Sequence, residues 1–373
     1  MVLTPTYYLA DFQSGDLLEP LPVGSVSRVA LESSLRPGRF QATVNLQAAG
    51  FSQGEARSWV DSIRYGVCTL VPVLEGVTDG DTITSRELGE WWIAAAEGSY
   101  RSPEVQISGP EWDGYLDHVL CPDDIVGMVD PVQKARELMD RCYTTSQAVR
   151  VDTQSWVSHT GARVRLDVKR HTRTYADVIQ DLATAEEGPF QWMTRTGLAL
   201  DGWVPRRVTR TLEVGQPRLA LSRPDVALEV TAPGMAPASL MDASWSWEKR
   251  AWPSTVYGWG AGAGDDQRGP VWRSRSRVTG EPSVNTMLTR RDAMTTGELG
   301  RHVKAALDRL TPESTVFEAT MPVDSYTPRK GERYEYLTDA GWTQPGRSRQ
   351  AQCAGWSWSS TRPETYSLDL VEV

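Results

Sequence analysis

The stretch Val26–Leu46, VSRVALESSLRPGRFQATVNL, decides the fold class. Two runs of aliphatic and polar residues flank Arg36-Pro37-Gly38, in which Pro and Gly suit the two central positions of a type II turn. Apolar side chains alternate with polar ones at Val29, Leu31, Val44 and Leu46. An alternating pattern of this kind predicts two antiparallel strands with one buried face.

Similar strand-like runs with Gly- and Pro-containing turns cover most of the chain, and helical patterns are few. We therefore expect a mainly β protein with an α+β insert. Its parts would be an antiparallel β-barrel-like domain at 1–125, a smaller α+β domain at 126–225, and a second β-barrel-like domain at 226–373 with one helix at 296–310.

Four helices are predicted from start signals that place an N-cap residue before an apolar stripe. The signals are Ser52-x-x-Glu55, Asp130-Pro131-x-Gln133, Thr174 and Thr295-x-x-Glu298. The helix that starts at Thr174 is expected to end at Gly188, a suitable C′ glycine. The segment after it predicts a hairpin that turns at Thr196-Gly197.

Length and charge exclude several classes of function. The 373 residues suffice for two or three domains, and 39 Lys and Arg against 48 Asp and Glu give a net charge of −9. A protein that binds phosphate backbones needs a basic face, so this balance argues against a general nucleic-acid binder. No stretch approaches the ~18–20 consecutive apolar residues of a membrane span.

The cysteines and histidines lack the spacing of metal ligands. They stand at Cys68, Cys121, Cys142, Cys353, His118, His159, His171 and His302, with no CxxC, CxH or HExxH pattern among them. We expect the cysteines to be small core residues and the histidines to be surface or packing residues. No metal site and no cofactor are therefore predicted.

The glycine-rich stretch Gly258–Asp266 allows three interpretations. A dinucleotide site requires a helix after the glycines, and the residues that follow have no helical period. Two adjacent carboxylates, Asp265 and Asp266, lack the spacing of a calcium loop. The interpretation we favour is a hairpin loop whose glycines permit positive φ or a close approach to a neighbour.

Arginines alternate with serines at Arg273, Arg275 and Arg277. On a strand, the three guanidinium groups would share one face and could bind phosphate, carboxylates or an acidic partner. The alternative is a solvated edge on which charge prevents unwanted strand pairing. Both interpretations stay open at this point.

Fifteen tryptophans include two similar pairs, Trp245/Trp247 and Trp356/Trp358, each with an intervening serine. Each pair would place two indoles on one strand face. Core packing or a subunit interface is the more frequent explanation of such residues, and a platform for sugars is the alternative.

No candidate catalytic residue emerges. A GxSxG nucleophile elbow is missing, and the adjacent acidic pairs Asp123-Asp124 and Glu186-Glu187 do not suggest two carboxylates that converge across a cleft. We therefore expect a protein that is not an enzyme.

In order along the chain, these pieces resemble the minor tail, or tail-tip hub, proteins of long-tailed bacteriophages, which are related to the N-terminal part of tail-associated lysins. The stretches that carry the resemblance are 11–22, 26–46, ISGPEWDGYLDHVL at 107–120, 174–193, STVYGWGAGAGDDQ at 254–267, 296–310 and YTPRKGERYEYL at 326–337. Three positions depart from the family pattern: His118 stands where Arg is expected, and Glu332 and Arg333 replace the usual Asp.

The resemblance implies a structural role in the virion, at the phage tail tip, for a protein made in the host cytoplasm. It implies a homotrimeric ring that contacts distal tail or tail tube proteins on one side and tip or fibre proteins on the other. Phage DNA, and with it the tape-measure protein, would pass through the lumen without specific binding. Because the lysins carry a C-terminal hydrolase and this sequence ends at LDLVEV, we expect no lytic activity. The alternative function is a carbohydrate- or receptor-binding tail module that uses exposed Trp pairs.

Overall fold

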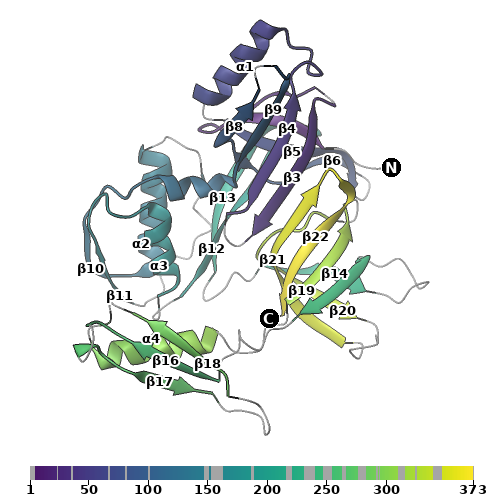
Figure 1. The fold of residues 1–373 in the computed structure, drawn as a ribbon. Helices are drawn as coiled ribbons and strands as arrows, with labels where there is room; N and C mark the ends of the chain where they lie inside the picture. The colour runs from purple at the N-terminus through teal and green to yellow at the C-terminus, as the bar shows by residue number, and fades with distance from the viewer. Residues whose placement is uncertain are drawn as a thin grey trace. The chain divides into compact units, whose positions relative to one another are not determined.

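The computed structural model describes most of the chain, with gaps. The described residues are 5–22, 24–34, 37–65, 68–79, 82–99, 101–146, 151–152, 163–185, 189–215, 221–230, 240–246, 254–262, 266–275, 283–290, 293, 295–309, 316–323, 326–338 and 347–372. The chain forms two compact units (Figure 1). The first comprises Met1–Ala243 and Glu318–Leu370, and the second comprises Ser244–Phe317 and Val371–Val373.

A five-stranded sheet near the N-terminus belongs to the first unit. It contains β1 (Thr6–Asp11), β2 (Leu17–Pro20), β5 (Cys68–Asp79), β6 (Thr82–Glu87) and β7 (Trp91–Trp92). The strand order is β2-β1-β5-β6, β7 also pairs with β5, and every pair is antiparallel. Helix α1 (Gln53–Tyr65) precedes β5, and its first turn has the predicted capping box between Ser52 and Glu55.

A ten-stranded sheet combines strands from both ends of the sequence. Its strands are β3 (Val26–Ser34), β4 (Arg39–Asn45), β8 (Ala95–Gly98), β9 (Glu104–Pro110), β14 (Leu221–Val230), β15 (Asp242–Ser246), β19 (Val316–Pro322), β20 (Glu332–Thr338), β21 (Arg347–Ser359) and β22 (Arg362–Glu372). The main path is β15-β19-β22-β21-β3-β4-β9-β8, with β20 on β21 and β14 on β20. In Figure 1, β3 and β4, from the purple end of the chain, lie near the yellow β21 and β22.

The hairpin predicted from Val26–Leu46 is confirmed, because β3 pairs antiparallel with β4. The mainly β fold class with several antiparallel sheets is also confirmed. Two strand pairs differ from the antiparallel prediction, because β14 pairs with β20 and β16 (Thr255–Trp259) pairs with β18 (Asn285–Thr289) in parallel. Among the described strands the pairing forms open sheets and closes no barrel. The boundaries at 125 and 225 stay a prediction.

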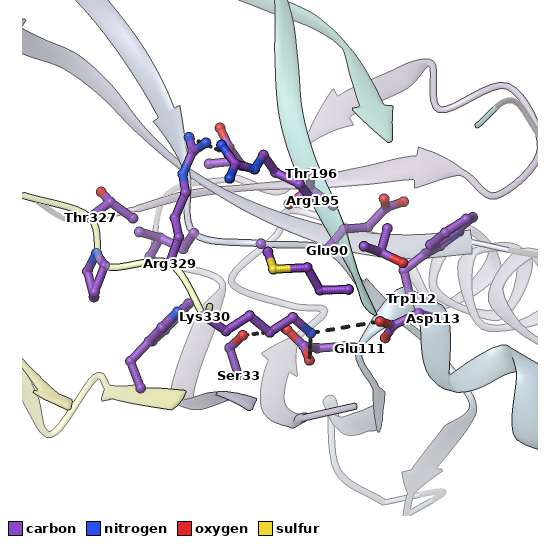
Figure 2. Close-up of a pocket in the computed structure, with 17 residues that line it drawn as sticks. Ser33, Glu90, Glu111, Trp112, Asp113, Arg195, Thr196, Thr327, Arg329 and Lys330 are labelled. Atoms are coloured by element: carbon purple, nitrogen blue, oxygen red, sulfur yellow. Dashed lines mark hydrogen bonds and ion pairs between the residues drawn. The ribbon is translucent and has the colours of Figure 1, made fainter. Parts of the chain in front are cut away.

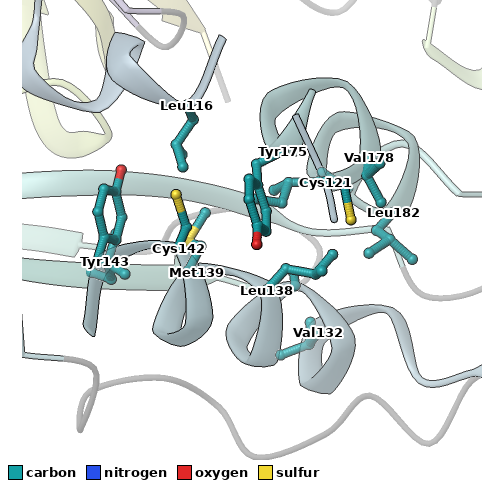
Figure 3. Close-up of a cluster of buried hydrophobic side chains, with 14 of the residues drawn as sticks. Leu116, Cys121, Val132, Leu138, Met139, Cys142, Tyr143, Tyr175, Val178 and Leu182 are labelled. Carbon is teal, nitrogen blue, oxygen red and sulfur yellow. The ribbon is translucent and has the colours of Figure 1, made fainter. Parts of the chain in front are cut away.

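The α+β part lies within the first unit. It contains the 3-10 helix η1 (Trp112–His118), β10 (Ile125–Val129), α2 (Pro131–Asp140), the π-helical turn η2 (Arg141–Ser146), β11 (Val164–Val168), α3 (Tyr175–Ala183), β12 (Gln191–Asp201) and β13 (Val204–Gly215). As predicted, Asp130 caps α2 by accepting a hydrogen bond from the backbone N–H of Gln133, with Pro131 in the first turn. Thr174 caps α3 in a capping box with Asp177. Figure 3 shows how apolar side chains of α2, η2 and α3 face one another in one core.

Two predictions in this part concern where an element ends. Helix α3 ends at Ala183 rather than continuing to Gly188, and Gly188 lies outside the described residues. The hairpin turn at Thr196-Gly197 is wrong, because both residues continue β12 and pair with Arg210 and Thr209. The chain turns instead at Gly202, whose φ of +64° is the left-handed conformation that glycine adopts without strain.

The second unit packs a helix against a three-stranded sheet. The sheet has the order β17-β16-β18, with β17 at Val271–Ser274. Helix α4 (Thr296–Arg309) covers one face and buries Leu299, Val303 and Leu307 against Val256. The helix predicted at 296–310 is thereby confirmed to within one residue. Its predicted stop, Pro312, lies outside the described residues.

None of the helices in the described part of the chain is long and apolar enough to cross a membrane.

Candidate functional site

A small polar cavity lies inside the first unit and is the candidate functional site (Figure 2). It holds about 60 Å³ of free space. Its walls come from β3, the β6–β7 connection, η1 and the residue before it, β12, the 327–330 loop and β21. Buried charged side chains surround it, among them Glu90, Glu111, Asp113 and Lys330. Because burial of an unpaired charge is costly, each of these groups requires a partner.

Lys330 is the buried cation on one side of the cavity. Its Nζ lies 2.7 Å from Oε2 of Glu111 and 3.8 Å from Oδ2 of Asp113, and Figure 2 shows the amine directed at both carboxylates. Glu111 also accepts hydrogen bonds from the Ser33 hydroxyl at 2.6 Å and from the Gly38 backbone N–H at 2.7 Å. The cluster therefore joins the 327–330 loop to β3 and to the end of β9.

Burial and charge act against each other in this cluster. Burial alone would lower the pKa of Lys330, but the carboxylates of Asp113 and Glu111 outweigh it and raise that pKa. Burial raises the pKa of Glu111, with the Lys330 ammonium opposing the shift. Lys330 is therefore held as a charged ammonium at neutral pH.

Arg210 and Glu90 form a second buried ion pair. Arg210, on β13, donates from Nε to Oε2 of Glu90 at 2.8 Å and from Nη2 to Oε1 at 2.6 Å. Their side chains are 1% and 0% exposed. Arg210 also donates to the Phe12 carbonyl at 2.8 Å, and the Thr69 hydroxyl donates to Glu90 at 2.6 Å. The guanidinium carbon lies 4.7 Å from the centre of the Trp112 ring, a cation–π distance.

A third, partly exposed pair lies at the edge of the cavity. Nη2 of Arg329 lies 3.3 Å from Oε1 of the buried Glu87. Burial raises the pKa of Glu87, and the Arg329 charge opposes that shift.

The arrangement resembles a structural cross-link more than a reaction centre. A nucleophilic lysine needs a lowered pKa, and that of Lys330 is raised. Glu90 accepts three hydrogen bonds, two of them from the guanidinium group of Arg210. About 60 Å³ is enough space for ordered water but not for a sugar ring.

The predictions for the cysteines are confirmed where the structure bears on them. Cys121, Cys142 and Cys353 are buried and Cys68 is half-buried. Burial raises the pKa of Cys142 to about 12, which makes it an unreactive thiol. Across the described residues, no three or more His, Cys, Asp or Glu side chains gather in a way that could hold a metal ion.

The structure describes three of the four histidines and one of the two acidic pairs. His118 and His171 are exposed, and His302 is half-buried on α4. Asp123 forms an ion pair with Arg141, and Asp124 accepts a hydrogen bond from the Arg170 backbone N–H. His159, Glu186 and Glu187 lie outside the described residues.

The glycine-rich stretch behaves as the favoured interpretation predicts. A Cβ at Gly258 would lie 2.2 Å from Cγ2 of Val303, so close packing of β16 on α4 requires glycine there. Gly262 has a φ of +103°. Asp265, one of the two candidate cation ligands, lies outside the described residues.

The arginine row is only partly described. Arg273 is exposed on β17, Arg275 follows the end of the strand, and Arg277 lies outside the described residues. A shared face of three guanidinium groups therefore stays a prediction.

Trp356 and Trp358 are core residues. They are 4% and 3% exposed, Trp356 lies edge-on to Trp91 and Tyr366, and Trp358 donates to the Pro363 carbonyl. This pair is therefore not an exposed platform for sugars. Trp247, from the other pair, lies outside the described residues.

Sequence reasoning did not single out Lys330 or Arg210. Lys330 lies 219 residues from Glu111, and Arg210 lies 120 residues from Glu90. No spacing rule connects residues so far apart. The one available signal was that lysine is rare, with five in the chain, and that Lys330 stands in a turn-like Pro-x-Lys-Gly context.

Comparison with known proteins yields structural but not sequence matches. No family model matches the chain, and no curated protein matches its sequence. The tail protein from Neisseria meningitidis has a TM-score of 0.56 at 14% identity, over 99% of this chain and 97% of that chain. The 43 kDa tail protein of prophage MuSo2 from Shewanella oneidensis has a TM-score of 0.57 at 12% identity, over 98% of both chains.

A prophage tail protein from Listeria monocytogenes gives a TM-score of 0.51 at 9% identity, over 98% of this chain and 94% of that chain. In each case the shared part includes both compact units. The resemblance stated from the sequence is therefore confirmed at the level of fold: over nearly its whole length, this chain has the fold of phage tail proteins.

Proposed function

We propose that this protein is a structural component of a bacteriophage tail tip, where three copies form a ring-like hub. The observation that carries the proposal is the end-to-end match to tail proteins, with 97–98% of two such chains covered. Because the match covers almost all of this chain and almost all of each tail protein, it supports a similar role for the whole chain rather than for one shared module.

The proposed hub joins distal tail or tail tube proteins to tip or fibre proteins, and phage DNA and the tape-measure protein pass through its lumen. We place it in the virion. In the assembled ring, the N-terminal and C-terminal strands would complete barrel-like units that the described part of the chain leaves open.

The residues that line a hollow on the ten-stranded sheet support the proposal that DNA passes the protein without being retained. The hollow holds about 490 Å³ and its lining includes five Ser or Thr residues and three charged ones, Glu32, Arg39 and Arg362. Two positive charges and one negative charge provide little of the phosphate neutralisation that tight DNA binding needs.

We further propose that the protein is not an enzyme. The paired state of Glu90 and the charged state of Lys330 support this. Purified host cell walls should keep their turbidity on addition of the protein, and clearing of the walls would contradict the proposal.

The deciding experiment measures the native mass of the recombinant chain and images it by electron microscopy, alone and in intact particles. A trimeric ring with a hole wide enough for duplex DNA is the expected result. A compact monomer both in solution at micromolar concentration and in particles would overturn the proposed hub.

A further inference from the structure

The three-stranded sheet of the second unit has one face covered by α4 and one face directed away from it. Val256 and Gly258 of β16 face the helix. Side chains alternate along a strand, so Tyr257 between them faces the other way. Tyr257 is paired with Trp272 on β17 and with Met287 on β18, which places the three side chains in one row across the sheet.

This row is unusually exposed for large apolar side chains. Tyr257 is 36% exposed, Trp272 57% and Met287 70%. Single exposed apolar residues are common, but these three lie next to one another on one sheet face and form a continuous apolar patch.

Uncharged polar groups flank the row. On one side Thr255 is paired with Ser274 and Asn285, and the hydroxyls of Thr255 and Ser274 lie 2.9 Å apart. On the other side Trp259 is paired with Thr289. The eight outward positions, which we call the aromatic face, are Thr255, Tyr257, Trp259, Trp272, Ser274, Asn285, Met287 and Thr289. None of them is charged.

The chemistry of the aromatic face suits a neutral, hydroxylated ligand with flat apolar surfaces. Indole and phenol rings offer flat apolar area to the C–H faces of a sugar ring. Hydroxyl and amide groups beside them can both donate to and accept from sugar hydroxyls. An anionic or cationic ligand would find no counter-charge among these eight residues.

The size of the aromatic face argues against a protein partner. Its strands have five, four and five residues. With strands about 4.8 Å apart and about 3.3 Å per residue, the face measures about 10 Å by about 17 Å. A stable protein interface covers about 800 Å² on each partner and 20–30 residues, several times more. An oligosaccharide of a few rings matches the face.

We infer that the aromatic face binds a neutral oligosaccharide, with Trp272 and Tyr257 as its stacking residues. The inference does not depend on the proposed hub, because the site lies within the second unit. It also differs from a platform built on Trp356 and Trp358, which are buried.

The test uses the full-length protein on an array of neutral oligosaccharides built from glucose, mannose, galactose and N-acetylglucosamine, followed by fluorescence titration with the binding sugars. We expect binding to at least one class. Trp272→Ala and Tyr257→Ala should each weaken it at least tenfold, and Met287→Glu, which keeps every ring, should weaken it through an unpaired charge. Trp203→Ala is the matched control, since Trp203 is 49% exposed at the β12–β13 turn of the first unit.

Three results would overturn the inference. One is silence across the whole array. The second is equal loss of binding in the Trp203→Ala control. The third is self-association of the wild-type chain that Trp272→Ala abolishes without any sugar binding, because the face would then dock a second copy. Circular dichroism of each variant separates these outcomes from misfolding, and a trimeric ring that binds no sugar would leave the hub proposal intact.

Discussion

Replacement of Arg210 by methionine should be among the most destabilising changes to the first unit. Methionine keeps most of the volume of the side chain but removes the guanidinium group that donates twice to Glu90 and once to the Phe12 carbonyl. Glu90 would remain fully buried, and among the described residues only the Thr69 hydroxyl would still donate to it. Loss of one partner of a buried ion pair costs about 3–5 kcal/mol, because the other charge is left unpaired.

The free energy of unfolding can be measured by guanidinium denaturation followed by circular dichroism. We expect Arg210→Met to lower it by about 3–5 kcal/mol. The double variant Arg210→Met/Glu90→Met should recover much of this loss, since it leaves no buried charge without a partner. Hydrogen exchange of β13 peptides would show that the loss is local to this strand and its neighbours.

The matched control lies on the same strand. Arg206 pairs with Asp201 at 3.2 Å, but the two side chains are 65% and 74% exposed. Arg206→Met should therefore change stability by no more than about 1 kcal/mol, as is usual for exposed pairs. If Arg210→Met costs no more than Arg206→Met, the pair is not the cross-link that we infer from its burial and geometry.

Three further changes test other parts of the fold. Burial raises the pKa of Tyr175 to about 12, above its unfolded value near 10, so the stability that this buried phenol contributes is full below pH 10 and is lost between about pH 10 and 12. The difference in phenolate absorbance between the wild type and Tyr175→Phe should therefore show ionisation of Tyr175 only well above pH 10. Gly258→Ala should destabilise the second unit by about 1–3 kcal/mol in thermal unfolding, because its methyl would clash with Val303, whereas Gly54→Ala, with nothing near its Cβ, should not destabilise. Asp130→Ala should cost about 1 kcal/mol and speed hydrogen exchange in the first turn of α2, and unchanged exchange there would contradict the cap.

The parts of the fold that the sequence predicts are those set by neighbouring residues. Helix starts at Asp130 and Thr174 depend on groups three residues apart, and the structure has both caps. The hairpin turn was misplaced because the sequence contains two candidate dipeptides, Thr196-Gly197 and Asp201-Gly202. Asp-Gly is the stronger hairpin signal of the two, and the chain turns there, after β12 and β13 have paired along eleven residues.

The tryptophans also show what neighbouring residues in the sequence cannot predict. An alternating Trp-Ser-Trp pattern states that two indoles share a face, but it does not state what covers that face. Trp356 and Trp358 lie on β21 inside the ten-stranded sheet, where Trp356 packs against Trp91 and Tyr366, while Trp272 lies on an edge strand of a three-stranded sheet and is exposed. What packs on the face of a sheet therefore decides the role of the aromatic residues on that face.

The two buried ion pairs join segments that lie far apart in the sequence. Burial of apolar area is favourable wherever it occurs, so it cannot by itself select which distant strands become neighbours. An ion pair in the interior is different, because a wrong partner leaves a buried charge unsatisfied at a cost of several kcal/mol. Lys330 with Glu111 joins the 327–330 loop to the end of β9, and Arg210 with Glu90 joins β13 to the connection between β6 and β7. We therefore expect these two pairs to specify which segments become neighbours, even where their net contribution to stability is small.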